Sequence, residues 1–193
     1  MNHYITISAS FVIGYLMKKS LCIFCGSHLG NNSSFSEATK AVAKLLVTNN
    51  IQLVYGGGRL GLMGVLANTM LELGGVVIGV QTRFLLGREG HAKLTKLHIV
   101  ETMHERKALM SKLADAFLLL PGGAGSLDEF FEVYTWSQLK LHSKPCAILN
   151  VNNYYDSLIQ FITHAVENEF LEQKDRNKLK IFNTIAPILE LMQ

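Results

Sequence analysis

The stretch LPGGAGSLDEFFEV, residues 120–133, combines residue types that suit the binding of an anion and the stabilisation of charge. Three glycines, Gly122, Gly123 and Gly125, leave the backbone bare just before a helical pattern begins. Backbone N–H groups at a helix N-terminus bind phosphate well, because the helix dipole places partial positive charge there. Glu129 adds a carboxylate one turn into the helix. The stretch therefore predicts a site for a phosphorylated ligand with a carboxylate beside it.

The same residues also fit a purely structural interpretation. Ser126 and Glu129 have the S-x-x-E spacing of a capping box, in which the two side chains satisfy free amides of the first helical turn. Spacing alone favours this interpretation, but an ordinary cap needs no run of three glycines before it. The two roles are compatible, because Glu129 can cap the helix when the site is empty and turn toward a ligand when one is bound.

Two basic residues and two more glycine-rich turns accompany this stretch. Arg106 and Lys107, in MHERK, fall in the first turn of the preceding helical pattern. The turns CGSHLG (25–30) and YGGGRLGLMG (55–64) each follow an apolar run. We expect the arginine, the carboxylate and the glycine-rich turns to converge on one crevice, provided that the apolar runs form parallel strands.

The elements that must position these residues alternate regularly along the chain. Six short apolar runs are continuous rather than alternating, as in strands buried on both faces. They are residues 20–25, 51–55, 76–80, 97–100, 116–120 and 146–150, separated by helical patterns at 34–49, 60–73, 103–114, 126–140 and 154–168, with shorter ones near 174–180 and 184–192. Strand then helix, five times, predicts a single-domain, Rossmann-like α/β fold: a parallel sheet with helices on both faces and ligands at the C-terminal edge.

Composition narrows the class of ligand and the compartment. The net charge of +3, from 18 basic and 15 acidic residues, is too small for a nucleic-acid binder but suits a small anionic ligand. Cys22 and Cys25 form a single CxxC, yet their odd spacing in a strand sends the side chains to opposite faces. We therefore expect Cys22, Cys25 and Cys146 to be buried and reduced, in a cytoplasmic protein. The seven histidines show no metal-binding spacing, so we expect no catalytic metal.

The N-terminal stretch is unlike the rest of the chain. Its apolar part is shorter than the ~20 residues that cross a bilayer. It also lacks the preceding positive charge of a secretory signal, since Lys18 and Lys19 come after it. We interpret residues 1–16 as a mis-assigned start or a dispensable extension, with a membrane role as the weaker alternative, and residues 17–193 as the functional domain.

A dinucleotide cofactor is the main alternative ligand. Gly56, Gly58 and Gly61 match GxGxxG between a strand and a helix. That motif normally needs an acidic residue at the end of the next strand, where this chain has GVQTRF instead. Arg83 leaves NADP as a weaker alternative, and no GKS or GKT marks a P-loop. We expect no cofactor, and a nucleotide or sugar phosphate as the ligand.

Five motifs, in this order, resemble those of the LOG ("Lonely guy") family: VYGGGRLGLMG, MHERKALM, LPGGAGSLDEFFEV, TWSQL and KPCAILN. These are cytokinin riboside 5′-monophosphate phosphoribohydrolases, long mislabelled as lysine decarboxylases, and the resemblance runs from about Leu21 to the C-terminus. It implies hydrolysis of the N-glycosidic bond of an AMP-like nucleotide, N6-prenylated ones included, giving free base and ribose 5-phosphate. It also implies a homodimer or larger homo-oligomer. The alternatives are a general nucleoside 5′-monophosphate nucleosidase in salvage and a non-catalytic nucleotide-binding protein.

The resemblance also implies roles for particular residues. Arg106 and Glu129 match the catalytic pair; Gly122, Gly123, Gly125 and Ser126 match the 5′-phosphate site; Gly57 and Gly58 line the nucleotide crevice, with Lys107 beside it. Cleavage of such a bond develops positive charge on the ribose, which a carboxylate stabilises directly or by orienting water. Arginine is always protonated, so Arg106 would clamp the substrate or stabilise the departing base.

Three departures from the family pattern bear on specificity. Ser126 replaces a threonine and keeps its hydroxyl, and Gln81-Thr82 stand where the family has Ile-Pro. The loop around Glu89 and His91 is about one residue shorter. Because this region lies near the base in the family, the departures concern base specificity more than the reaction. We interpret Glu89 and His91 as solvated loop residues, with substrate contact as the alternative.

Overall fold

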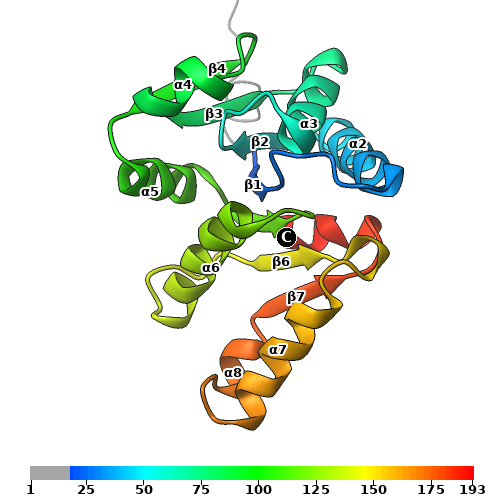
Figure 1. The fold of residues 1–193 in the computed structure, drawn as a ribbon, viewed down its shortest axis with the longest axis vertical. Helices are drawn as coiled ribbons and strands as arrows, with labels where there is room; N and C mark the ends of the chain where they lie inside the picture. The colour runs from blue at the N-terminus through cyan, green and yellow to red at the C-terminus, as the bar shows by residue number, and fades with distance from the viewer. Residues whose placement is uncertain (1–17) are drawn as a thin grey trace, which may run out of the picture.

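Seven parallel strands form the centre of the protein, in the order β4-β3-β2-β1-β5-β6-β7 (Figure 1). The computed structural model describes residues 18–193, so the predicted extension at residues 1–16 lies outside the described residues. The strands are β1 (Ser20–Phe24), β2 (Gln52–Tyr55), β3 (Val77–Thr82), β4 (Lys96–Val100), β5 (Ala116–Leu119), β6 (Cys146–Leu149) and β7 (Leu179–Phe182). Because every neighbouring pair is parallel, the C-terminal ends of all seven strands meet at one edge.

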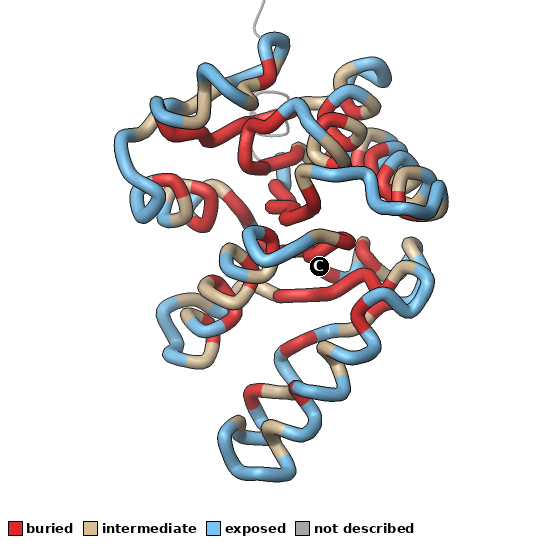
Figure 2. The backbone as a smooth tube through the Cα atoms, in the orientation of Figure 1, coloured by how far each residue is buried: buried red, intermediate tan, exposed pale blue. Residues whose placement is uncertain are grey.

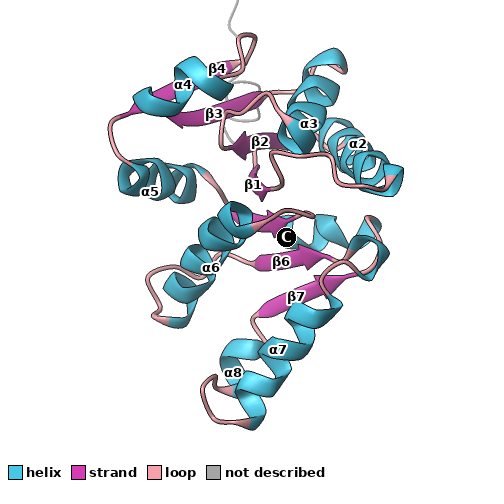
Figure 3. Cartoon of the chain, in the orientation of Figure 1, coloured by secondary structure: helices cyan, strands magenta, loops and turns pink. Residues whose placement is uncertain are grey.

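Helices cover both faces of this sheet (Figure 3). One face packs against α2 (Ser33–Thr48), α3 (Gly61–Glu72) and the 3₁₀ helix η2 (Ala186–Met192). The other packs against α5 (Met103–Leu113), α6 (Ala124–Gln138) and α7 (Asp156–Glu167). Three short elements complete the fold: α4 (Arg83–Glu89), η1 (Val151–Asn153) and α8 (Gln173–Arg176). The predicted Rossmann-like α/β fold is confirmed.

The five inner strands are largely buried on both faces, as their continuous apolar runs predicted (Figure 2). The edge strand β4 differs, because none of its residues is buried, although the run LHIV predicted a buried strand. In β1, Leu21 and Ile23 belong to the core beneath α2 and α3, while Cys22 and Phe24 belong to the core beneath α5 and α6. Cys25 lies in the first of these cores, so the two cysteines of the CxxC face opposite sides of the sheet, as predicted. Within residues 18–193 all three cysteines are buried and unbonded.

Three sequence predictions about local structure were wrong. The pattern at 174–180 is not one helix: α8 ends at Arg176, and β7 follows as a strand. Strand β7 lies at the edge of the sheet, and its two middle residues are partly exposed. Its sequence is therefore not a continuous apolar run that would predict a strand. Residues 83–89 form the helix α4 rather than the predicted loop. Because no residue of this helix is buried, its sequence has no apolar stripe from which a helix could be predicted. The pattern at 184–192 forms the 3₁₀ helix η2 rather than an α-helix.

The order in which strands are added to the sheet reverses between β1 and β5, two neighbouring central strands. From β1 the strand order runs outward through β2 and β3 to β4, and then returns to β5 on the other side of β1. The loops that leave β1 and β5 therefore turn toward opposite faces, and a crevice opens between them. Among residues 18–193, no helix has both the length and the apolar character that crossing a membrane requires.

Candidate active site

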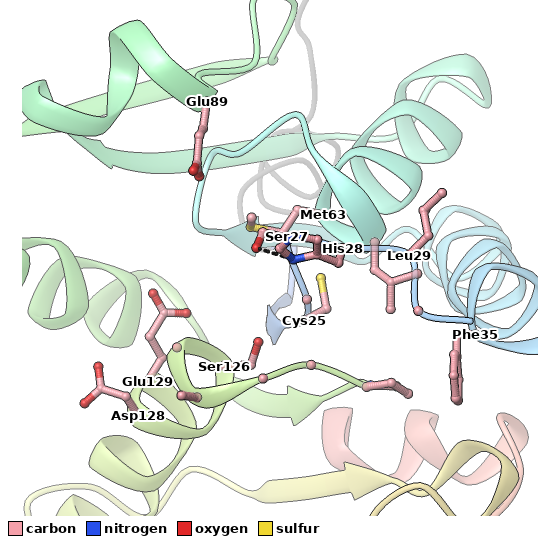
Figure 4. A pocket seen from close by; sticks show the side chains of 18 of the residues that line it. Cys25, Ser27, His28, Leu29, Phe35, Met63, Glu89, Ser126, Asp128 and Glu129 are labelled. Carbon is pink, nitrogen blue, oxygen red and sulfur yellow. Dashed lines mark hydrogen bonds between the residues drawn. The ribbon is translucent and has the colours of Figure 1, made fainter. Parts of the chain in front are cut away.

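A cavity of about 570 Å³ opens at this crevice (Figure 4). Its walls come from the loop after β1 (25–30), the loop after β5 and the start of α6 (121–126), and from α3 through Leu62 and Met63. Glu89, at the end of α4, lies on the wall across from Ser126 and Glu129. The volume falls in the range of sites for small molecules. The predicted convergence of glycine-rich turns at one edge is therefore confirmed for the turns after β1 and β5.

Arg106 lies at the bottom of this site and uses all three of its nitrogen atoms. Nε donates to Val80 O (2.9 Å), Nη2 donates to Gly56 O (3.2 Å), and Nη1 donates to Oε1 of Glu129. Both side chains are largely buried, with 6% of Arg106 and 16% of Glu129 exposed. The ends of β2 and β3 thus fix the guanidinium, which in turn fixes Glu129. The second carboxylate oxygen, Oε2, has no hydrogen-bond partner among the described residues, and Glu129 lines the cavity.

The predicted capping box at Ser126 and Glu129 was wrong. Helix α6 begins at Ala124, with Gly123 as its N-cap, so Ser126 is already the third residue of the helix. Glu129 pairs with Arg106 instead of reaching back to a cap amide. The S-x-x-E spacing misled because the glycine N-cap supplies no side chain from which the start of the helix could be recognised.

A capping box does occur, at the start of α5. Thr102 Oγ1 accepts from the amide of Glu105 (3.1 Å), and the Glu105 carboxylate accepts from the amide of Thr102 (3.2 Å). This reciprocal pair defines where α5 begins. It therefore fixes Arg106 in the first turn of the helix, directed at the sheet edge.

Helices α3 and α6 both begin at the cavity, and their free amides differ. In α3 the amides of Leu62 and Met63 donate to Gly26 O, at 3.0 and 3.3 Å. In α6 the first backbone bond is from Leu127 N to Gly123 O (3.1 Å), and no side chain caps the N-terminus. The first-turn amides of α6 are therefore available to an anion in the cavity, whereas those of α3 are occupied by the protein itself.

The predicted phosphate-site residues all line the cavity, and the three glycines among them meet different steric requirements. A Cβ atom at Gly122 would overlap Ser126 Oγ and lie 2.9 Å from the Gly26 amide, so only glycine fits there. A Cβ atom at Gly123 or Gly125 would meet nothing within 4 Å. At these two positions glycine leaves the backbone open on the side of the solvent.

Gly57 and Gly58 are not among the residues that line the cavity. The carbonyl of Gly57 accepts from His91 N (3.0 Å), and Gly58 forms an isolated bridge with Gly90. Gly57 also has a φ of +75°, which favours glycine. The structure thus places the pair behind the cavity wall, where it holds the end of α4.

Lys107 also lies outside the cavity wall. Its Nζ is 2.8 Å from Oδ2 of Asp128 and 3.5 Å from Oε2 of Glu132, and 13% of its side chain is exposed. Burial alone would lower the pKa of Lys107, but the hydrogen bonds and charges of Asp128 and Glu132 raise it above the ordinary value. Lys107 thus pairs with a carboxylate that lines the cavity.

The interpretation of His91 as a solvated residue was wrong. Its side chain is buried, with Nε2 3.0 Å from Asn68 Oδ1. Burial lowers the pKa of His91, and the charge of Lys93 lowers it further. The bridge between Gly58 and Gly90 folds this segment back onto the domain, and sequence periodicity carries no signal for such a bridge.

Sequence reasoning missed several residues of the cavity wall: Ser27, His28, Phe35, Met63, Met103 and Tyr154. Ser27 and His28 lie in a turn that was recognised without any residue being assigned, and Ser27 Oγ is 3.4 Å from Nδ1 of His28 (Figure 4). Tyr154 follows β6 closely, at the same edge of the sheet, and this position was the available signal. Its hydroxyl donates to Gly122 O (2.8 Å).

Arg83, the residue considered for NADP, does not line the cavity. It is exposed, and its guanidinium pairs with Glu101 at 2.9 Å. Among residues 18–193, no group of three or more His, Cys, Asp and Glu side chains is arranged to hold a metal ion.

Fold and site together define a Rossmann-like protein with a cavity whose free amides suit a phosphorylated small molecule. The family model described as "Possible lysine decarboxylase" matches residues 63–192. A cytokinin riboside 5′-monophosphate phosphoribohydrolase of Rhodococcoides fascians is 43% identical over 169 residues, covering 86% of this chain and 85% of that protein. The phosphoribohydrolase LOG1 of Arabidopsis thaliana is 46% identical over 160 residues, covering 82% and 75%. The chain belongs to this family, the LOG family, and the resemblance in its motifs is confirmed.

Solved structures with the same fold include proteins of another kind. The molybdenum cofactor binding protein of Rippkaea orientalis has a TM-score of 0.69 at 15% identity, covering 92% of this chain and 96% of that one. The Moco carrier protein of Chlamydomonas reinhardtii has a TM-score of 0.70 at 15% identity, covering 91% and 98%. At this identity the likeness concerns the fold alone.

Proposed function

We propose that the protein hydrolyses the N-glycosidic bond of AMP and of N6-modified AMP, releasing the free base and ribose 5-phosphate. One observation carries the proposal. Glu129 has one carboxylate oxygen held by the buried Arg106 and lines the cavity about one helical turn from the free amides of α6. The names of the curated relatives, at 43% and 46% identity, support the same activity.

The start of α6 binds the 5′-phosphate in this proposal. The amides of the first turn and the hydroxyl of Ser126 are donors, and Gly123 and Gly125 leave the approach open. Gly122 allows the loop to pass close to Ser126. With the phosphate there, the ribose reaches Glu129, and the base lies toward the wall that contains Glu89.

The carboxylate of Glu129 does the chemical work. As the bond between C1′ and the base nitrogen breaks, positive charge develops on the ribose and the bonding electrons leave with the base. Glu129 stabilises that charge and accepts a proton from the attacking water, whose oxygen bonds to C1′. Glu129 then gives up this proton, which passes through solvent to the departing base nitrogen, so water is divided into the hydroxyl group on the ribose and the proton on the base. Arg106 transfers no proton, because arginine stays protonated; it orients the carboxylate.

We further propose that residues 17–193 are the functional unit and that it acts in the cytoplasm as a homodimer or larger homo-oligomer. Three buried, unbonded cysteines support a reducing compartment. Exposed large apolar side chains support self-association. Those on the surface of the described residues include Phe84, Leu139, Leu141, Phe161 and Phe170.

The test measures release of free base from AMP and from N6-isopentenyl-AMP by chromatography. Glu129→Gln should lower the rate by on the order of 10²–10³ while AMP still binds. Glu132→Gln is the matched control, because Glu132 lies on the same helix, pairs with Lys107 and does not line the cavity. The ratio of rates for the two substrates separates a cytokinin-releasing enzyme from a salvage nucleosidase. Binding without base release from any monophosphate would leave a nucleotide-binding protein.

A further inference from the structure

The three carbonyl groups that lead into α6 all accept hydrogen bonds from outside their own loop. The donors are the Tyr155 hydroxyl to Leu120 O (2.9 Å), the Gly26 amide to Pro121 O (3.0 Å) and the Tyr154 hydroxyl to Gly122 O (2.8 Å). Two of these donors are adjacent tyrosines from the segment between η1 and α7. An entire loop thus has its carbonyl oxygens held by neighbouring elements.

Holding a carbonyl also fixes the amide of the next residue. In a trans peptide the C=O and the following N–H belong to one plane and point in opposite directions. The described residues contain no cis peptide bond. The hydroxyl of Tyr154, by holding Gly122 O, therefore fixes the direction of the Gly123 amide. Gly123 is the N-cap of α6 and lines the cavity.

The peptide between Gly122 and Gly123 needs such a restraint more than most. Neither residue has a Cβ atom, and glycine accepts positive φ about as readily as negative φ. This peptide can therefore rotate by about half a turn with little steric opposition. The rotation would exchange a donor for an acceptor at the start of α6, and so would bring partial negative charge toward a bound anion.

Tyr154 is itself held in place. Its ring packs edge-on against Phe35, with centroids 5.5 Å apart, and against Tyr155, at 4.7 Å. The turn before it places Asn152 and Asn153 at φ values of 54° and 58°, a conformation that asparagine tolerates better than most residues. The packing restrains the ring independently of the hydroxyl, so the hydroxyl can be removed without disturbing the ring.

We propose that Tyr154 is a positioning residue for phosphate. Its hydroxyl locks the peptide between Gly122 and Gly123 so that the Gly123 amide is presented to the 5′-phosphate. The inference rests on the proposed function of this site and adds a residue that acts through the backbone. It predicts that loss of the hydroxyl weakens recognition of the phosphate and leaves recognition of the nucleoside part unchanged.

The test compares Tyr154→Phe with the native Tyr154, both in the Glu129→Gln background so that AMP is not hydrolysed, using AMP, adenosine and inorganic phosphate as calorimetric probes. The affinities for AMP and for phosphate should fall about tenfold, as expected for one hydrogen bond to a charged group, while the affinity for adenosine stays the same. In turnover with Glu129 intact, KM for AMP should rise and kcat should change little. Equal weakening of AMP and adenosine, or no weakening of either, would overturn the proposal.

Tyr155→Phe is the matched control. It removes the bond to Leu120 O and the contact of the Tyr155 hydroxyl with the backbone of Gly122, but it keeps the bond from Tyr154 to Gly122 O that orients the Gly123 amide. This variant should lose thermal stability, because the hydroxyl is buried and its partner is left unsatisfied. Its ratio of AMP to adenosine affinity should equal that of the wild type. A fall in that ratio as large as in Tyr154→Phe would contradict the mechanism.

A second variant tests the peptide rotation itself. Gly123→Ala places a Cβ atom where nothing lies within 4 Å, and alanine resists the positive φ that the rotated peptide requires. Adding Tyr154→Phe to Gly123→Ala should therefore lower phosphate affinity by less than about threefold, against about tenfold in the glycine background. Equal losses in the two backgrounds would exclude the rotation.

The binding measurements also separate this proposal from the proposed enzyme function. If the wild type binds AMP but releases no base, the enzyme function fails, and the ratio of affinities still decides the role of Tyr154. If the wild type binds neither AMP nor inorganic phosphate, both proposals fail.

Discussion

The guanidinium of Arg106 occupies the space that a side chain at Gly56 would need. A Cβ atom on Gly56 would overlap Nη2 of Arg106, and this same nitrogen donates to the Gly56 carbonyl at 3.2 Å. The φ of Gly56 is not positive, so glycine is required here for close approach and not for backbone conformation. The end of β2 and the first turn of α5 thus fit together only because residue 56 has no side chain.

We expect Gly56→Ala to behave like a substitution in the proposed catalytic pair, Arg106 and Glu129. The added methyl group displaces Arg106, which then no longer orients Glu129, and kcat/KM for AMP should fall by on the order of 10²-fold or more. Steady-state kinetics measure the effect, and circular dichroism checks the fold. Gly87→Ala is the control, because a Cβ atom there meets nothing within 4 Å. Wild-type activity in Gly56→Ala would show that the position of Arg106 is irrelevant to the reaction.

Replacing Lys107 should affect both stability and substrate binding. Lys107→Gln leaves Asp128 and Glu132 without their cation, and Asp128 lines the cavity close to the proposed phosphate site. We expect the free energy of unfolding to fall by about 1 kcal/mol. We also expect KM for AMP to rise severalfold, and more at low salt than at high salt. A KM that does not change with the variant at any ionic strength would contradict this role.

The glycines before and within α6 should respond differently to alanine. Gly122→Ala drives a Cβ atom into Ser126 Oγ and should abolish AMP binding. Gly125→Ala meets no neighbour and replaces a poor helix former, so the free energy of unfolding should rise by up to about 1 kcal/mol. Thermal unfolding and AMP titration measure the two effects. Equal effects of the two substitutions would show that the contact between Gly122 and Ser126 does not shape the site.

Two histidines should make stability depend on pH. Nδ1 of His91 accepts the amide of Lys93 (3.3 Å) and Nδ1 of His142 accepts the amide of Lys144 (3.1 Å), so a proton on Nδ1 would break either bond. Burial lowers the pKa of both side chains below the ordinary value. The unfolded chain, with histidine pKa values near about 6.5, therefore binds protons first as the pH falls. Stability is fully present above that pH and decreases as the pH drops through it.

The measurement is the melting temperature between pH 7.5 and 5.5. It should decrease toward acidic pH in the wild type, and a variant carrying His91→Gln and His142→Gln should show a shallower decrease. If the double variant keeps the full slope, these histidines do not cause the pH dependence.

The parallel sheet could be predicted because its strands are continuous apolar runs, and a glycine-rich turn follows three of them. The proximity of Arg106 and Glu129, and the position of residues 121–126 at the cavity, followed from two motifs whose elements start at the same edge of that sheet. β7 could not be predicted, because an edge strand with partly exposed residues has neither a continuous nor a strictly alternating pattern. Helix α4 could not be predicted for a related reason: a helix that buries no residue needs no apolar face, so its sequence shows no helical periodicity.

Contacts between distant segments account for the remaining errors in the site. Gly57 and Gly58 form the turn that was predicted, but the bridge to Gly90 turns them away from the cavity. Tyr154 reaches Gly122 across 32 residues of sequence. Such pairs depend on the order of strands in the sheet, and that order cannot be derived from local periodicity.

The occupied N-terminus of α3 has a consequence for the number of phosphates that the site can bind. Gly26 O takes the amides of Leu62 and Met63, which in a dinucleotide-binding protein would be free for a second phosphate at the GxGxxG turn. The start of α3 is thus closed by the fold itself, whereas the start of α6 is open. If the start of α6 binds the 5′-phosphate as proposed, a pyrophosphate would find the amides of Leu62 and Met63 already bound to Gly26 O, so the arrangement favours a monophosphate over a dinucleotide.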